Sequence, residues 1–308
     1  MTKYLFPGNI AYEYIPPEKK SICAVIITYN PEADFSINIA QVAQQVDKVI
    51  IVDNGSSNFC LKKIQEICSI HNAFLIMNFC NRGVATALNQ GIEYAKNCDY
   101  EWILTLDQDS FPTDKMVEKL IAVYYCFPDK KHIGVIAANP IDGKTGNCPY
   151  KTSCKDKVWI QQKVVITSGS LFPIKLFNYI GPFKDEFFID GVDQEYCLRL
   201  KKNGYQVIIA CKAHLIHSLG QPKICEFIGI SFIPMNCSPL RYYYITRNSL
   251  SMIREYLFSE PCWIIQHLMG FIKRLVKMLL FEENKWVKVK SITKGIWHGL
   301  IGKSGPLN

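Results

Sequence analysis

Residues 102–109 read WILTLDQD, an apolar run that ends in two carboxylates. The run is short and rich in large apolar and β-branched residues, which predicts a buried β-strand. Asp107 and Asp109 follow it on either side of Gln108. Two carboxylates one residue apart at a strand end can bind one divalent cation, which can in turn bridge two phosphates. Because acidic surface loops are common, a solvated loop is the alternative interpretation.

Similar apolar runs lie on both sides of this strand. They are Ile22–Thr28, Lys48–Val52, Phe74–Met77 and Ile133–Ala137. Helical spacing of apolar residues predicts helices between them, over 35–45, 59–70, 84–97 and 113–127. Short apolar strands that alternate with helices are typical of a parallel sheet covered on both faces. The sequence therefore predicts an α/β fold with a doubly wound, mostly parallel sheet.

Polar clusters follow three of the predicted strands. They are Thr28-Tyr29-Asn30, Asp53-Asn54-Gly55-Ser56-Ser57 and Asn81-Arg82-Gly83. Since ligands of such sheets bind at the carboxyl ends of the strands, we expect the first two clusters to meet Asp107 and Asp109 at one edge. Asp53 could accept hydrogen bonds from a ribose or a base, or its cluster could simply cap the next helix. Arg82 at a helix start could bind an anion, or could be a solvated side chain beside a cap.

The order and spacing of these clusters, with Asn89-x-Gly91, resemble those of inverting family 2 glycosyltransferases. Within that family the chain is similar to the rhamnosyltransferase branch. The resemblance covers about residues 21–220. It implies a GT-A fold, a nucleotide-diphosphate sugar donor and a Mg²⁺ or Mn²⁺ ion held by Asp107 and Asp109. It also implies that Thr28 and Asn30 lie at the nucleotide base, with Asp53 beside uracil or thymine. The donor-binding residues are thus expected to be Thr28, Tyr29, Asn30, Asp53, Asn81, Arg82, Gly83 and Asp107.

The stretch DGVDQEYCLR, residues 190–199, resembles the family segment that carries the acceptor-activating carboxylate. The resemblance places Asp193 at that carboxylate, where it would take the proton of the acceptor hydroxyl. Many members have an acid just before it; this chain has Val192, and Asp190 could compensate. The alternative role for Asp193 is a helix cap. The family often has a histidine near the position of His217, which is expected to be a third metal ligand, although a lone histidine is often structural.

The expected domains are a catalytic GT-A domain over 1–220 and a helical, basic region over 221–308. Residues 273–303 carry eight Lys or Arg against Glu282 and Glu283. The helix predicted over 262–281 has a polar stripe, which consists of Gln266, His267, Gly270, Lys273, Arg274 and Lys277, and a wide apolar face. Such a helix suits a membrane surface, or it packs on the catalytic domain or a second copy. Arg247, in YYYITRNSL, is expected either to contact diphosphate or to be solvated.

The composition and the N-terminus indicate the cellular compartment of the protein and limit the classes of partner. Thirteen cysteines, an odd number with no C-x-x-C pair, and an N-terminus unlike a signal peptide indicate reduced thiols in the cytoplasm. No apolar stretch is long enough to span a membrane. The expected location is therefore the cytoplasm, with peripheral attachment to the inner face of the membrane. The turn-rich stretch over 140–160 is expected to be a flexible loop, and no motif of a nucleic-acid reader accompanies the basic end.

The expected function is transfer of a sugar, favoured to be L-rhamnose from dTDP-rhamnose, to a glycan or lipid-linked acceptor. A UDP-hexose donor remains an alternative. A nicotinamide dehydrogenase is disfavoured because the first βα turn, TYNPEAD, has no G-x-G-x-x-G. A sugar nucleotidyltransferase would need a Gly-rich basic loop at the same place. A non-catalytic glycan-binding or scaffold protein on this fold stays open.

Overall fold

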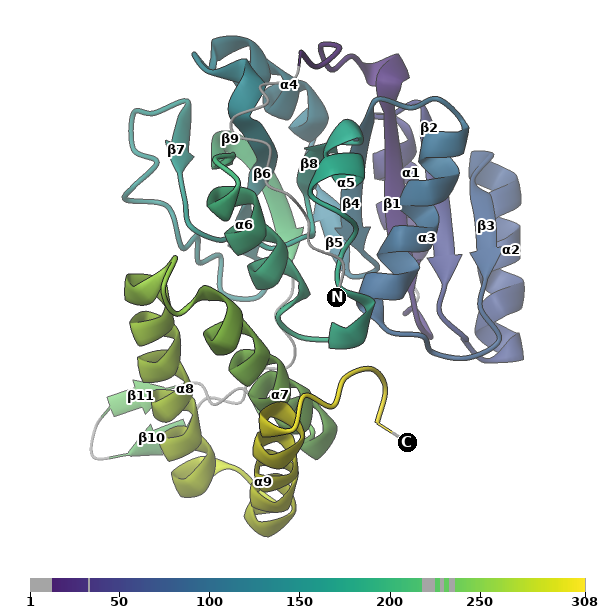
Figure 1. Ribbon diagram of the computed structural model, residues 1–308. Coiled ribbons are helices and arrows are strands. Elements are labelled where there is room, and N and C mark those ends of the chain that lie inside the picture. The colour runs from purple at the N-terminus through teal and green to yellow at the C-terminus, as the bar shows by residue number, and fades with distance from the viewer. Residues whose placement is uncertain (1–12, 33, 218–224, 228–229, 233–235, 308) are drawn as a thin grey trace.

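The computed structural model of the chain describes residues 13–32, 34–217, 225–227, 230–232 and 236–307. A large mixed sheet with helices on both faces forms the upper part in Figure 1, and three long helices form the lower part. The strands are β1 (Ile22–Thr28), β2 (Lys48–Asp53), β3 (Phe74–Met77), β4 (Trp102–Asp107), β5 (Ser110–Pro112), β6 (Ile133–Asp142), β7 (Trp159–Gln161), β8 (Ser170–Pro173), β9 (Gln206–His217), β10 (Cys225–Phe227) and β11 (Ile230–Phe232). The helices are α1 (Phe35–Ala43), α2 (Asn58–His71), α3 (Val84–Asn97), α4 (Met116–Cys126), α5 (Lys175–Tyr179), α6 (Val192–Lys202), α7 (Pro239–Tyr256), α8 (Pro261–Phe281) and α9 (Lys285–Leu300), with short 3₁₀ turns η1 (Lys19–Ser21), η2 (Lys130–His132) and η3 (Asp185–Phe187).

The sheet has the order β3-β2-β1-β4-β8-β6-β9-β5, with β7 paired to β9. The first four strands are parallel, so the predicted α/β fold is confirmed. The strand order reverses between β1 and β4, and this is where open α/β sheets bind ligands. One detail differs from the expectation: β8 inserts between β4 and β6 and is antiparallel to both. Strand β8 begins at Ser170.

The stretch over 140–160 is more ordered than a flexible loop. It ends in β7, which pairs with β9, and a disulfide joins Cys154 to Cys211. The prediction that the thiols are reduced is therefore wrong for this pair. The two cysteines are 57 residues apart in sequence. Their contact depends on the pairing of β7 with β9, which no local spacing reveals.

The main core lies between the sheet and its covering helices. Strand β1 is buried along its whole length, as its continuous apolar run predicts. Helix α3 packs close to β1 at Gly91, where an added Cβ would lie 2.4 Å from a methyl group of Val25. The core extends into the C-terminal helices through Met252, Tyr256 and Ile264. Residues of α7 and α8 thus pack into the same core as the sheet, and the expected division near residue 220 stays a prediction.

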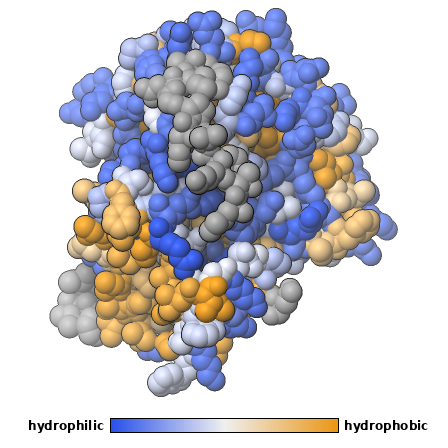
Figure 2. All heavy atoms as spheres, viewed as in Figure 1, coloured by the Kyte–Doolittle hydropathy of each residue, from blue (hydrophilic) through white to orange (hydrophobic). Residues whose placement is uncertain are grey.

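The outer face of α8 is apolar. Figure 2 shows apolar side chains gathered over this helix. Its exposed large residues are Ile265, Leu268, Met269, Ile272, Val276, Leu279 and Leu280. The predicted polar stripe is divided, because His267, Gly270 and Arg274 line a cavity on the inner side. None of the helices in the described part of the chain is both long and apolar enough to span a membrane.

Candidate active site

Asp107, Asp109 and His217 meet at the carboxyl edge of the sheet. Asp107 ends β4, and His217 ends β9. One ligand atom from each of the three side chains lies within 4.8 Å of the others. Nδ1 of His217 is 3.5 Å from Oδ1 of Asp109. Two carboxylates and an imidazole suit Mn²⁺, and carboxylates suit Mg²⁺ as well. The expected convergence is confirmed, whereas metal binding by these residues stays a prediction.

The electrostatics of this group favour a cation. Burial raises the pKa of the Asp107 carboxyl; His217 lowers this pKa, and the nearby Asp109 raises it. The net effect is a raised pKa, so the charged carboxylate is unfavourable in the metal-free protein. A divalent cation would offset both the burial and the repulsion between the two acids.

Two buried serines, neither of which belongs to a recognisable motif in the sequence, link these residues. The backbone N–H of Asp107 donates to Oγ of Ser168 over 3.0 Å. The Ser168 hydroxyl donates to Oγ of Ser110 over 2.7 Å, and Oγ of Ser110 lies 2.8 Å from Nδ1 of His217. Such partners orient metal ligands. Ser168 is 61 residues from Asp107, so no local pattern marks it.

Asp53 is buried at the end of β2, and its carboxylate orders the turn that follows. Oδ1 accepts from the hydroxyl of Thr28 over 3.1 Å and from that of Ser56. Oδ2 accepts from the backbone N–H groups of Ser56 and Gly55 over 3.0 and 3.3 Å. The cap of α2 is a different residue of the cluster, Ser57, whose side chain accepts a hydrogen bond from the first turn. Asp53 thus joins the ends of β1 and β2.

Gln108 ties the end of β4 to the end of β1. Its amide accepts from the N–H of Tyr29 over 2.7 Å and donates to the carbonyl of Tyr29 over 3.3 Å. Asn30 adopts a left-handed backbone conformation with φ 47°. It bonds to the next loop, accepting from the N–H of Ser57 and donating its own N–H to Ser56. The half-exposed Tyr29 ring and Asn30 are therefore held at the point where the strand order reverses.

The loop before α3 is held by Asn54. Its side chain donates to Oδ1 of Asn81 and to the carbonyl of Gly83, and it accepts from the N–H of Arg82. The Arg82 side chain is exposed, as an anion-binding residue would need to be. Gly83 has φ 89°, and a Cβ there would lie 2.6–2.8 Å from atoms of Phe188. Glycine is required by both the conformation and the contact.

Asp193 lies in the first turn of α6, within electrostatic reach of the group at Asp107. Burial raises its pKa to about 6; the N–H of Gln194, which donates over 2.9 Å, opposes the shift, and the charges of Asp190 and Asp107 add to it. The N-cap of α6 is Gly191, which has no capping side chain. The helix-cap interpretation of Asp193 is therefore wrong. A carboxylate with a pKa near neutrality is suited to proton transfer.

Asp190 does not stand in for the acid missing at Val192. Its carboxylate forms a bidentate pair with Arg241 of α7, with distances of 2.7 and 3.1 Å. The pair fixes the loop before Asp193 to the C-terminal helices.

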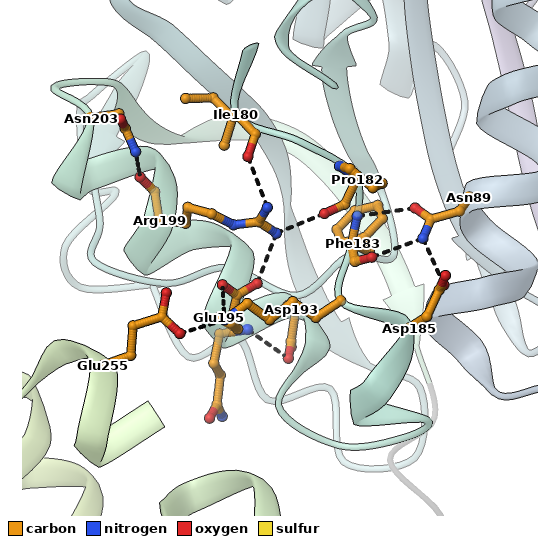
Figure 3. A network of polar contacts seen from close by, with 12 residues as sticks. Asn89, Ile180, Pro182, Phe183, Asp185, Asp193, Glu195, Arg199, Asn203 and Glu255 are labelled. Carbon is orange, nitrogen blue, oxygen red and sulfur yellow. Dashed lines mark hydrogen bonds and ion pairs between the residues drawn. The ribbon is translucent and has the colours of Figure 1, made fainter. Parts of the chain in front are cut away.

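A second buried network holds α6 in place (Figure 3). Glu195 is fully buried, and it accepts from Arg199 over 2.9 Å and from the hydroxyl of Tyr256 over 2.8 Å. Arg199 also donates to the carbonyls of Ile180 and Pro182, each over 2.8 Å. Every oxygen of this buried acid thus has a partner, which makes its role structural.

Neither expected role of Arg247 is correct, because its guanidinium is buried and bonded to backbone. It donates to the carbonyls of Glu186 and Gly305. The neighbouring Asn248 has its amide nitrogen 2.9, 2.9 and 2.7 Å from the carbonyls of residues 187, 189 and 190. The two side chains on α7 therefore hold the loop that precedes Asp193. The sequence alone did not show what lies opposite them.

Comparison with known proteins places this geometry in a family. Residues 23–147 match the family model described as Glycosyl transferase family 2. The dTDP-rhamnosyl transferase RfbF of Shigella flexneri is 34% identical over 249 residues, which are 76% of this chain and 80% of RfbF. The chain belongs to glycosyl transferase family 2.

This glycosyltransferase also shares its fold with two solved structures. One is TarS 1-349 from S. aureus (TM-score 0.58, 14% identity, 90% of this chain and 80% of that one). The other is mannosyltransferase PcManGT from Pyrobaculum calidifontis in complex with GDP-Man and Mn²⁺ (TM-score 0.57, 13% identity, 94% and 89%).

Family membership decides between the enzyme classes that the sequence left open. The glycosyltransferase acts with a nucleotide-sugar donor, and the GT-A fold expected from the motifs is confirmed. A dehydrogenase and a nucleotidyltransferase are both excluded. The roles of individual residues stay predictions.

Proposed function

We propose that this glycosyltransferase moves L-rhamnose from dTDP-L-rhamnose to a saccharide acceptor, with inversion at the anomeric carbon. The observation that carries the proposal is that Asp107, Asp109 and His217 come together and that the charge of Asp107 acts on the pKa of Asp193. The name and 34% identity of RfbF support rhamnose as the sugar. The donor set supports a divalent ion, and the Mn²⁺ of the mannosyltransferase complex favours Mn²⁺ over Mg²⁺.

Asp107, Asp109 and His217 would hold the ion, which when bound neutralises the diphosphate that leaves. Asp193 takes the proton of the acceptor hydroxyl as the new bond between that oxygen and the anomeric carbon forms. The bond from the anomeric carbon to the diphosphate oxygen breaks on the opposite side, and nucleoside diphosphate leaves with the electron pair. The buried network at Glu195 holds the helix that carries Asp193 in place.

The nucleotide is proposed to bind along the ends of β1, β2 and β3. Tyr29 and Asn30 are exposed there and can reach a base. Asp53 and Thr28 are buried and bonded to each other, so they shape the base pocket. The exposed Arg82 next to the start of α3 would pair with phosphate, for which a helix N-terminus is also favourable.

A donor screen tests the proposal. Release of nucleoside diphosphate is measured with dTDP-L-rhamnose, UDP-glucose, UDP-N-acetylglucosamine and GDP-mannose, with Mn²⁺, Mg²⁺ or a chelator. We expect dTDP-L-rhamnose to give the highest kcat/KM and the chelator to abolish release. A preference for a UDP-hexose would reject the rhamnose donor, and release that persists with a chelator would reject the metal.

We also propose that the outer face of α8 rests on an anionic membrane surface. Ile272 and Leu279 are 58% and 49% exposed on this face. Lys277, also exposed, is among the basic residues that can approach anionic headgroups. Lys288 adds little, because it is buried in an ion pair with Glu282 at 2.7 Å. A lipid-linked acceptor would be presented at this surface.

Sedimentation with vesicles of phosphatidylglycerol and phosphatidylcholine at low salt tests the membrane proposal. The double variant Ile272→Glu, Leu279→Glu should bind the vesicles about 100-fold more weakly. Burial of each of these two aliphatic side chains in the membrane contributes about 1.5 kcal/mol or more to the free energy of binding. Ile37→Glu on α1 is the matched control, since Ile37 is 60% exposed and distant from α8 in sequence. A wild-type protein that stays in the supernatant would reject the proposal.

A further inference from the structure

A cavity lies between the start of α6 and the helices α7 and α8. Its volume is about 200 Å³. Asp190, Gly191 and Gln194 line one wall and lie within three residues of Asp193 in the sequence. Figure 1 shows α7 and α8 directly below α6. The cavity therefore lies where α7 and α8 meet the start of α6, the helix that carries the proposed base.

The lining is mixed in polarity. Met252 and Phe271 contribute apolar surface, while Ser249 and His267 contribute a hydrogen-bonded pair with 2.8 Å between Oγ and Nε2. Burial, together with the positive charge of Arg274, lowers the pKa of His267, so its imidazole is neutral near pH 7. The cavity therefore offers a ligand both apolar surface and fixed hydrogen-bonding groups.

Arg274 is a charged residue in the cavity wall that lacks a polar partner among the residues that the structure describes. It is half-buried and lines the cavity, yet the structure gives it no hydrogen bond or ion pair with any described residue. Asp190, the acid in the same cavity, is already paired with Arg241. A guanidinium presents a planar fork of donors that matches a phosphate, and a partly buried one without a partner is suited to bind an anion.

Helix α8 presents Arg274 on its inner side and the apolar stripe of Ile272, Val276 and Leu279 on its outer side. A ligand in the cavity would place an anion at Arg274 and extend toward the start of α6, the helix that carries Asp193. We propose that the cavity is the acceptor subsite and that Arg274 pairs with a phosphate of the acceptor. The proposal rests on the proposed function and specifies its acceptor: a saccharide carrying a phosphate, either on a lipid or within the glycan.

Calorimetric titration with octyl phosphate, below its micelle concentration and with EDTA present, tests this subsite without donor or turnover. The chelator prevents a cation at Asp107 from recruiting the phosphate. We expect the wild type to bind octyl phosphate, and Arg274→Gln to weaken binding about 10- to 100-fold, as for a charged hydrogen-bonded partner. Lys273→Gln is the matched control, because it removes the same charge from an exposed neighbour, and it should change binding less than twofold.

Gly270→Leu provides a second variant that retains Arg274. A Cβ at Gly270 meets nothing within 4 Å, so a leucine can enter the cavity without a clash, and leucine favours the helix. Octyl phosphate should no longer bind this variant, while its melting temperature should not fall. Equal effects of Lys273→Gln and Arg274→Gln, or unchanged binding in Gly270→Leu, would overturn the subsite.

Inorganic phosphate and octyl glucoside separate the possible sources of the anion. Tighter binding of octyl phosphate than of inorganic phosphate assigns the phosphate to a lipid-linked acceptor, and equal binding assigns it to the glycan. Octyl glucoside should bind wild type and Arg274→Gln alike. If octyl glucoside binds the wild type as tightly as octyl phosphate does, the anionic acceptor is rejected. Because none of these titrations uses a nucleotide sugar, their outcome is independent of the donor screen.

Discussion

Asp193→Asn is expected to lower the rate of sugar transfer by about 10²- to 10⁴-fold, the usual contribution of a general base, while the donor still binds. The variant keeps the shape of the side chain, and its amide oxygen can still accept the hydrogen bond from Gln194. It has no basic oxygen to take the proton from the acceptor hydroxyl. Steady-state transfer with dTDP-L-rhamnose measures the loss, and titration with the same donor and Mn²⁺ measures binding. Turnover equal to that of the wild type would remove Asp193 from its proposed role.

The pH dependence of kcat/KM distinguishes loss of the general base from a disturbance of the structure around residue 193. The carboxylate must be deprotonated to accept a proton, so wild-type kcat/KM should fall as the pH drops below the pKa of Asp193, which is about 6 without metal. A cation bound beside Asp107 would lower this pKa and move the fall to lower pH. The residual transfer by Asp193→Asn should lack this acidic limb. A limb that persists in the variant would assign it to another group.

The carboxyl edge of the sheet was predictable because its signals are local. Short, fully apolar runs rich in β-branched residues, such as Ile22–Thr28, favour buried central strands, and parallel strands bring their ends together. The polar residues that follow β1, β2 and β4 therefore had to share an edge. His217 was placed by a resemblance, and the structure brings it to Asp109 through the pairing of β9 with β5.

The supporting residues were not predictable, because their roles depend on distant partners. Ser168 reaches Asp107 only because β8 inserts beside β4. Arg247 looks like an ordinary helical arginine in the sequence, and only the fold shows that backbone carbonyls surround it. Arg274 was assigned to a polar stripe on a surface helix. The packing of α8 on α7 turned it inward, which periodicity within one helix cannot show.

Asp107→Asn is expected to abolish the response to Mn²⁺ and to lower transfer by about 10²- to 10³-fold, because metal stabilisation of the leaving diphosphate is worth several kcal/mol. The same change should not destabilise the metal-free protein. Burial raises the pKa of Asp107, so its ionised form opposes folding above that pKa, and a neutral amide of the same size removes the cost.

Thermal melting with and without Mn²⁺ distinguishes these effects. Binding of Mn²⁺ to the folded state should raise the melting temperature of the wild type, and the increase should grow with Mn²⁺ concentration. Asp107→Asn should melt at or above the wild-type temperature without metal, and Mn²⁺ should not shift it. Asp129→Asn is the control, because Asp129 precedes β6 at the opposite edge of the sheet and bonds His132 over 2.8 Å; it should keep the full Mn²⁺ shift. If Mn²⁺ raises the melting temperature of Asp107→Asn as much as that of the wild type, the metal binds elsewhere and the proposed site at the end of β4 is rejected.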